Sequence, residues 1–272
     1  MKYLLAVSAL LMFVVPGHAQ RARASQASLT RAEVKAAEQM LSDLGYWTGP
    51  IDGIFDAGSH SALLAFQKWQ GREATGELSL NEFEAIRTAA RPRAREVGYR
   101  HVEVDLDRQV LMLVDEAGRV RILPVSTGNN KTFIDEGQES IAYTPRGRFL
   151  VYGKEVGWKT GSLGSTYYAN FISGGVAIHG SRSVPNEPAS HGCIRIPMFA
   201  ARDVSRLMKL GTIVLVYDKL SFVSAMDWAK NPKLKEAAMA SLGAEVDDGF
   251  DPLAANSKAP TAKKLRPRSI RS

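Results

Sequence analysis

The segment ASHGCIRIP at residues 189–197 contains Cys193, the only cysteine in a chain of 272 residues. A free cysteine often serves as a small buried apolar side chain, but then its neighbours on alternate positions of a strand are usually apolar. Here Ser190, His191 and Gly192 come directly before it. Because a thiol beside an imidazole can attack a carbonyl carbon, Cys193 is a candidate nucleophile.

Two histidines are candidates for the base that would take the thiol proton. His179 follows the apolar run VAI in GGVAIHG, so a strand is expected to carry it to the end of a sheet. His191 stands two residues before Cys193, and in an extended segment both side chains would face the same side. Local spacing leaves the choice open. Gly192 would let the backbone approach a ligand closely, and the amides of Gly192 and Cys193 are candidate donors to an oxyanion.

The same side chains could instead bind zinc, which takes nitrogen and sulfur ligands. His179, His191 and Cys193 would then belong to a metallopeptidase or to a structural metal site. The sequence offers no evident fourth ligand. Thiol chemistry needs no metal and no organic cofactor, so neither is expected.

Strands are the elements that must position these residues. The segment HVEVDLDRQVLMLVDEAGRVRILPVSTG, which starts at residue 101, alternates in polarity and predicts a strand, a turn at EAGR and a second strand. RFLVYGKE and TIVLVYD predict further strands. Only residues 198–211 predict a helix, with Pro197 at its first turn and Gly211 as its stop. We therefore expect a mainly β domain at residues 99–218.

Three short helices are expected before that domain. Residues 31–44 have apolar side chains at helical spacing, and Thr30 with Glu33 predicts an N-terminal capping box. The segments SHSALLAFQKWQG and SLNEFEAIRTAA predict the second and third helices.

The expected fold is therefore α+β with two domains. A small three-helix bundle at residues 29–90 is followed by a linker at 91–98 and by the β-rich, sandwich-like domain. Because a linker joins them, the bundle is expected to be separable from the domain that carries Cys193.

The N-terminus predicts export. Lys2 is followed by an apolar run of about a dozen residues, too short to span a bilayer as a helix. Small residues at Gly17 and Ala19 suit a cleavage site, so residues 1–19 are interpreted as a signal peptide, with no transmembrane segment after its removal.

The positive charge of the chain belongs to its ends. The formal net charge is +7, and Lys2 together with six basic residues in 258–272 accounts for all of it. Residues 20–257 are therefore neutral overall, and nucleic acid is not an expected partner. A helical extension is expected at 219–243 and a disordered basic tail at 244–272, whose charge could give a weak contact with an anionic surface.

The helical region resembles a known binding domain. LGYWTGPIDGIFD, ALLAFQKWQG and TGEL are similar to the small three-helix peptidoglycan-binding domain. Asp56 stands where that family usually has glycine, and Ser59 with His60 stands where it usually has threonine and a basic residue. The resemblance implies peptidoglycan, both glycan wall and stem peptides, as the partner, and these changes bear on affinity rather than on fold.

The β-rich region resembles the YkuD-type L,D-transpeptidases. The resemblance rests on IHG, on SHGCIR beginning eleven residues after His179, and on PVSTG and TPRGRFLV upstream. It implies that His179 is the general base, that Cys193 is the nucleophile, and that the carbonyl of Gly180 holds His179. One departure is the long segment NNKTFIDEGQESIAY at 129–143, which bears on the groove of the acceptor.

The same resemblance assigns the residues around Cys193. It places Ser190, His191 and Gly192 at the oxyanion and substrate carbonyl, and Arg195 near substrate carboxylates. The expected function is that of an exported cell-wall enzyme, which acylates its cysteine with a peptidoglycan stem and passes the acyl group to an amine. The alternatives are a noncatalytic peptidoglycan-binding protein and an L,D-carboxypeptidase or other hydrolase of the same family.

Overall fold

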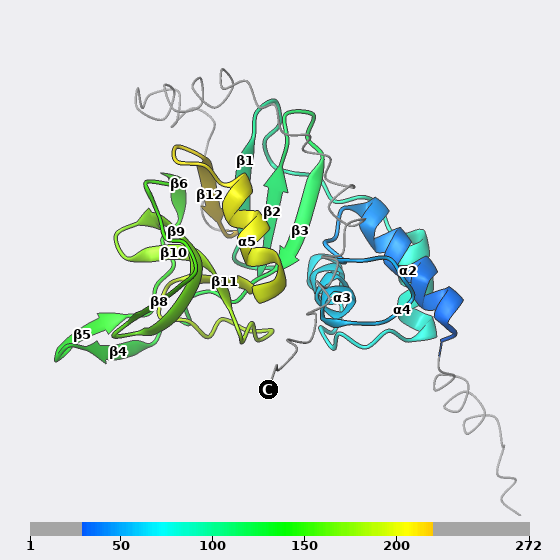
Figure 1. Ribbon diagram of the computed structural model, residues 1–272, viewed down its shortest axis with the longest axis horizontal. Coiled ribbons are helices and arrows are strands. Elements are labelled where there is room, and N and C mark those ends of the chain that lie inside the picture. The colour runs from blue at the N-terminus through cyan, green and yellow to red at the C-terminus, as the bar shows by residue number, and fades with distance from the viewer. Residues whose placement is uncertain (1–28, 220–272) are drawn as a thin grey trace, which may run out of the picture.

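The computed structural model describes residues 29–219. The expected signal peptide, the basic tail and all but the first residue of the helical extension at 219–243 lie outside the described residues. Within 29–219, helices come first and strands dominate afterwards, so the chain has the expected α+β, two-domain fold (Figure 1).

Each helix of the first domain begins at a side-chain cap. The Thr30 side chain accepts from the amide of Glu33, and the Glu33 carboxylate accepts from the amide of Thr30, which confirms the expected capping box. Oδ1 of Asp56 accepts from the amides of Gly58 and Ser59, so the residue that departs from the family pattern caps the second helix. The helices of this domain are α2 (Arg31–Leu44), α3 (Ala57–Gln70) and α4 (Leu80–Thr88).

The second domain contains two facing sheets. In the first, the strand order is β3-β2-β1-β12-β6, with β1 and β12 parallel and the other pairs antiparallel. The sequence predicted two strands after residue 101, but the structure has three. A turn at Leu106–Gln109, with Gln109 at φ 53°, divides the first predicted strand into two. The strands of this first sheet are β1 (His101–Asp105), β2 (Val110–Val114), β3 (Val120–Pro124), β6 (Gly147–Leu150) and β12 (Ile213–Tyr217).

The second sheet carries the catalytic candidates. Its order is β11-β10-β9-β7, with β8 also paired to β9, and β10 and β11 are parallel. A separate hairpin, β4–β5, occupies the long segment between STG and TPRG. These strands are β4 (Thr132–Asp135), β5 (Gln138–Ile141), β7 (Gly153–Lys154), β8 (Trp158–Gly161), β9 (Gly164–Ser173), β10 (Val176–Ser181) and β11 (Ile194–Pro197).

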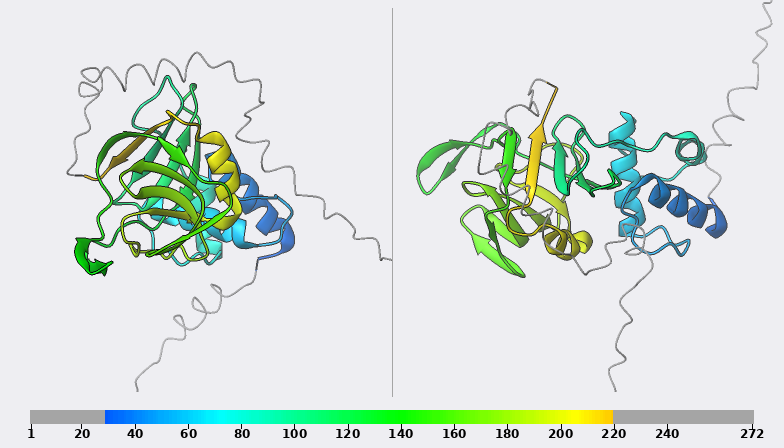
Figure 2. Two further views of the ribbon diagram at one scale, coloured as in Figure 1. Left: turned by 60° about the vertical axis from the view of Figure 1, so that its left-hand side comes forward. Right: turned by 90° about the horizontal axis from the view of Figure 1, so that it is seen from above.

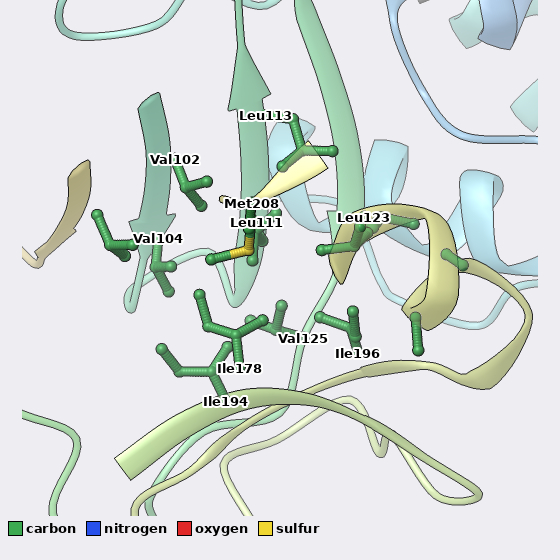
Figure 3. Close-up of a cluster of buried hydrophobic side chains, with 14 of the residues drawn as sticks. Val102, Val104, Leu111, Leu113, Leu123, Val125, Ile178, Ile194, Ile196 and Met208 are labelled. Atoms are coloured by element: carbon green, nitrogen blue, oxygen red, sulfur yellow. The ribbon is translucent and has the colours of Figure 1, made fainter. Parts of the chain in front are cut away.

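The main core lies between the two sheets. Figure 3 shows Val102, Leu111 and Leu123 of the first sheet pointing toward Ile178 and Ile194 of the second. Figure 3 also places Met208 among them, just after α5 (Met198–Leu207). This packing fixes β10 and β11 against a rigid support, which matters because the candidate site lies at their ends.

Helix α5 ends earlier than expected. Pro197 precedes its first turn as predicted, but the helix stops at Leu207 rather than near Gly211. The ammonium of Lys154 binds the carbonyl oxygens of Ser205 and Met208 at that end. The Lys154 ammonium on β7 therefore binds carbonyl oxygens that would accept hydrogen bonds from backbone amides if the helix continued.

The helical domain is packed onto the first sheet, on the side away from the second sheet and the β4–β5 hairpin (Figure 2, right). Backbone hydrogen bonds join the segment after α2 to strand β3, from Trp47 N to Ile122 O and from Ile122 N to Gly45 O, at 3.0 and 2.8 Å. The two domains also share one apolar cluster, in which bundle side chains such as Leu41 and Phe66 meet buried side chains of β2 and β3. The sheet residues in that cluster are Val110, Met112, Val114, Val120 and Ile122.

Residues 91–98 are bound to the β-rich domain as well. The buried carboxylate of Glu103 accepts hydrogen bonds from the backbone amides of Arg95 and Glu96, from the His101 ring and from the Tyr217 hydroxyl. Burial alone would raise the pKa of Glu103, but the hydrogen bonds from His101, Arg95 and Glu96 outweigh it and hold the pKa below its usual range. The segment between the domains is thus anchored rather than free to swing.

No helix within residues 29–219 has both the length and the apolar character needed to cross a bilayer.

Candidate active site

Cys193 and His179 share one cleft of about 860 Å³ in the second sheet. His179 lies in β10, and Cys193 comes immediately before the neighbouring strand β11. In the register of this parallel pair His179 lies opposite Arg195. Cys193 is two residues before Arg195 and therefore lies near His179 across the pair. All three side chains line the cleft. The sheet therefore brings together residues that are 14 positions apart in the sequence.

The ring of His179 is buried and has one defined hydrogen bond. Its Nδ1 lies 2.9 Å from the carbonyl oxygen of Gly180. Because a carbonyl oxygen only accepts, Nδ1 carries the proton and Nε2 is the unprotonated nitrogen of the neutral ring. Burial lowers the pKa of His179, and the nearby charge of Arg195 lowers it further, although the bond to Gly180 opposes both. The neutral form, which can accept a proton, is therefore favoured at neutral pH.

Gly180 is needed for close packing behind His179. A Cβ at this position would lie 2.5 Å from the Cβ of Ala201 on α5 and 3.1 Å from the ring of Tyr167 on β9. The strand that carries His179 can approach the helix only where there is no side chain. The glycine thus sets the position of the histidine by its size as well as through its carbonyl.

The thiol of Cys193 is partly buried at the edge of β10. Its Sγ lies 3.7 Å from the carbonyl oxygen of Gly175. Burial raises the pKa of the thiol, and a backbone hydrogen bond from Ala177 and the charge of Arg195 offset only part of that effect. The resting pair is accordingly a neutral thiol with a neutral imidazole, rather than a preformed ion pair.

A network of short hydrogen bonds fixes the turn before Cys193. Oγ of Ser190 donates to the carbonyl oxygen of Cys193 at 2.6 Å and accepts from the amide of Gly192 at 3.0 Å. Gly192 has φ 133°, and a Cβ there would lie 2.8 Å from the Tyr143 carbonyl oxygen. The Gly192 amide is engaged by Ser190 in this geometry, so it could donate to an oxyanion, as expected from the sequence, only if Ser190 released it.

The segment after β3 holds the same turn through hydrogen bonds. Ser126 exchanges backbone hydrogen bonds with Arg195, and the amide of Ser190 donates to the carbonyl of Thr127 at 2.9 Å. Oγ1 of the buried Thr144 accepts from the amide of Gly128 and donates to the carbonyl of Gly192, at 2.8 and 2.7 Å. The PVSTG and TPRG motifs thus hold the two sides of the cysteine turn.

His191 lies at the exposed rim of the cleft. Its ring centroid is 4.6 Å from that of Phe133 on the β4–β5 hairpin. The other side of the cleft is built by the β8–β9 hairpin, including Trp158 and Lys159, and by Arg182 just after β10. His191 and His179 therefore have different environments, one exposed against an aromatic ring and one buried with a fixed tautomer.

Residues 29–219 contain no group of three or more histidine, cysteine, aspartate or glutamate side chains placed to bind a metal ion.

Comparison with known proteins places this geometry in a family. The family model for the L,D-transpeptidase catalytic domain, YkuD, matches residues 99–216, and the model for a putative peptidoglycan-binding domain matches residues 30–86. The solved structure of an L,D-transpeptidase from Xylanimonas cellulosilytica DSM 15894 is 38% identical, with a TM-score of 0.65. The similarity covers 71% of this chain and 95% of that one. This chain belongs to the L,D-transpeptidase family.

More distant solved L,D-transpeptidases also match. The structure from Stackebrandtia nassauensis is 22% identical over 68% of this chain and 90% of its own, with a TM-score of 0.40. The catalytic domain from Enterococcus faecium is 25% identical over 46% of this chain and 100% of its own, with a TM-score of 0.36. Among curated proteins, none matches the sequence.

Several site residues of this L,D-transpeptidase family member were not apparent from its sequence. Trp158 and Lys159 line the cleft because β8 pairs with β9, the neighbour of β10, and Arg182 lines it directly after β10; no local pattern marks these contacts. Phe133, which packs against His191, lies in the long segment 129–143, where the sequence analysis predicted no strand. Thr144 belongs to the TPRG segment that carries part of the resemblance, but only the fold shows that its hydroxyl joins Gly128 to Gly192.

Proposed function

We propose that this protein is an exported cell-wall L,D-transpeptidase that uses Cys193 as its nucleophile and His179 as its base. The observation that carries the proposal is the fixed tautomer of His179, whose unprotonated Nε2 belongs to the same cleft as the Cys193 thiol. A buried neutral imidazole is suited to take a proton from a thiol at the moment of attack.

The proposed reaction has two transfers. The thiol proton passes to Nε2 of His179 as sulfur attacks a carbonyl carbon of a peptidoglycan stem, at the L-centre of diaminopimelate. The bond to the terminal D-amino acid breaks, and the proton on Nε2 goes to the leaving amine. An amine of a second stem then attacks the thioester, His179 takes its proton, and the released sulfur regains a proton from the imidazolium. No oxidant or cofactor is needed for this balance.

The surrounding residues have supporting roles in this proposal. The Cys193 amide and the exposed His191 are the candidate donors to the developing oxyanion. Ser190 fixes the turn, Gly180 fixes His179, and Arg195 supplies positive charge to a substrate carboxylate. The helical domain is proposed to contact the wall polymer, in keeping with its family.

Product analysis tests this function. The purified protein is incubated with a tetrapeptide stem as donor and a second stem as acceptor, and the products are identified by mass spectrometry. A joined dimer that has lost one terminal D-residue supports amine transfer. A shortened stem with no dimer at any acceptor concentration would instead identify a carboxypeptidase, and unchanged stems would identify a noncatalytic binding protein.

A further inference from the structure

The cleft that holds Cys193 is lined by more positive than negative side chains. Lys159, Arg182 and Arg195 line it, whereas Glu155 is its one acidic lining residue among those described. His179 is favoured in its neutral form and does not add charge. A positive cleft attracts anionic ligands, and stem peptides carry several free carboxylates.

Arg182 contacts an aromatic side chain at this cleft. Its guanidinium carbon lies 4.8 Å from the ring centroid of Trp158, and that ring packs 5.0 Å from the ring of Tyr167. A guanidinium stacked on an aromatic face keeps its N–H groups in its own plane, where they can bind a carboxylate with two parallel hydrogen bonds.

The N–H groups of Arg182 have no acidic partner among the described residues. The ion pairs formed within 29–219 involve other arginines, such as Arg146 with Asp218 and Arg206 with Asp203. Arg182 is therefore both oriented by Trp158 and available to a ligand.

We propose that Arg182, supported by Trp158, binds a carboxylate of the donor stem and so determines donor specificity. This inference rests on the proposed function. Arg182 follows β10 three residues after His179, a separation of roughly 10 Å along an extended backbone. The group it binds therefore lies away from the attacked carbonyl, on diaminopimelate or on the acidic residue that precedes it. Arg195, directly opposite His179, is the residue nearer the reacting carbonyl.

Binding measured without turnover isolates this role. Dissociation constants are measured by calorimetry for the Cys193→Ala protein and for the same protein with Arg182→Gln added. Three tetrapeptide donors are compared, all with a free C-terminal carboxylate: one unmodified (the free donor), one amidated at diaminopimelate and one amidated at the preceding acidic residue. Arg206→Gln in the Cys193→Ala protein is the matched control, because Arg206 is exposed on α5 and lies outside the cleft.

Arg182→Gln is expected to raise the dissociation constant of the free donor on the order of fivefold, the scale of an exposed ion pair. One of the two amidated donors should bind the Cys193→Ala protein about as weakly as the free donor binds the protein with Arg182→Gln added. Its dissociation constant should not change further on Arg182→Gln, and the position of its amide identifies the carboxylate that Arg182 binds. Arg206→Gln should change nothing. Equal weakening of all three donors, no weakening of any, or no saturable binding of the free donor would overturn the proposal. Failure of the proposed function appears separately, as absence of an acyl adduct in the Cys193-containing protein.

Discussion

Nζ of Lys68, on helix α3 of the first domain, donates to the carbonyl oxygen of Val125 at 3.0 Å. Val125 comes directly after β3, and the next residue, Ser126, exchanges backbone hydrogen bonds with Arg195 in the cysteine turn. A second contact joins the domains nearby, from the side chain of Asn186 to the carbonyl of Ala74. The helical domain therefore supports the segments that hold the catalytic candidates.

Lys68 is expected to make stability depend on pH in the alkaline range. Burial lowers the pKa of its ammonium to about 8, although Glu187 opposes the shift, whereas the unfolded chain keeps the ordinary value of 10.5. Between these values the unfolded state binds more protons, so the contribution of this group to the free energy of unfolding rises with pH and is lost as pH falls through 8. Urea denaturation at pH 7.5, 9 and 10 should show this slope in the parent.

The matched comparison uses Lys68→Met and the exposed Lys35→Met. The difference in free energy of unfolding between parent and Lys68→Met should grow in favour of the parent as pH rises, while that for Lys35→Met stays flat. A constant difference for Lys68→Met would show that its ammonium is not buried against Val125.

Removal of residues 29–90 is expected to destabilise the β-rich domain, contrary to the separable module expected from the sequence. The truncation would expose the buried apolar side chains of β2 and β3, each contributing about 1.5–3 kcal/mol on burial. Urea denaturation of the truncated protein should show a loss of several kcal/mol or no cooperative transition, and turnover of soluble stems should fall with it. An unchanged denaturation midpoint with full turnover would show that the shared core is dispensable.

Gly180→Ala tests the packing behind the proposed base. The added methyl group would overlap Ala201 and Tyr167, so β10 must shift, at a cost of about 1–3 kcal/mol for overpacking. The rate of acylation should fall together with stability. Gly153→Ala on β7 is the control, because Gly153 lies outside the cleft and a Cβ there would meet only Phe171, at ordinary contact distances of 3.6 and 3.8 Å. Equal stability and equal acylation rates for the two variants would contradict the close approach of β10 to α5.

The protonation state of Cys193 predicts how it reacts with iodoacetamide in the absence of substrate. Because burial raises the pKa of the thiol above the ordinary value of 9.0 and lowers that of His179, little thiolate exists at pH 7. Alkylation should be slower at pH 7 than for a free thiol and should rise continuously past pH 9. Acylation by a stem should instead weaken on the acid side only, as pH falls through the lowered pKa of His179 and the base gains a proton. Rapid alkylation at pH 6, with a plateau at neutral pH, would indicate a preformed ion pair.

Much of the fold was predictable because its signals are local. Thr30 and Glu33 mark a helix start through a contact three residues apart, and the alternation after residue 101 marks strands. The turn at Leu106–Gln109 was missed because Leu106 continues the apolar alternation across it. The end of α5 was missed because Lys154, far away in the sequence, binds its last carbonyls.

The candidate site divides in the same way. Cys193 and the two candidate histidines stand out by residue type, but local spacing could not choose between the histidines. The family resemblance pointed to His179, and the structure adds its burial and its bond to Gly180. The roles of Lys68 and Arg182 depend on contacts between segments distant in the chain. The engagement of the Gly192 amide depends on the rotamer of Ser190, which no spacing rule specifies.

Intact-protein mass spectrometry after mixing with a donor stem tests the central claim most directly. The parent protein should gain the mass of the stem minus that of the released free D-amino acid, as a thioester on Cys193. A folded Cys193→Ala protein should show no adduct, and His179→Ala should form it on the order of 10²-fold more slowly, the usual scale for a positioned base. An adduct that forms in Cys193→Ala, or equally fast in His179→Ala, would contradict the account.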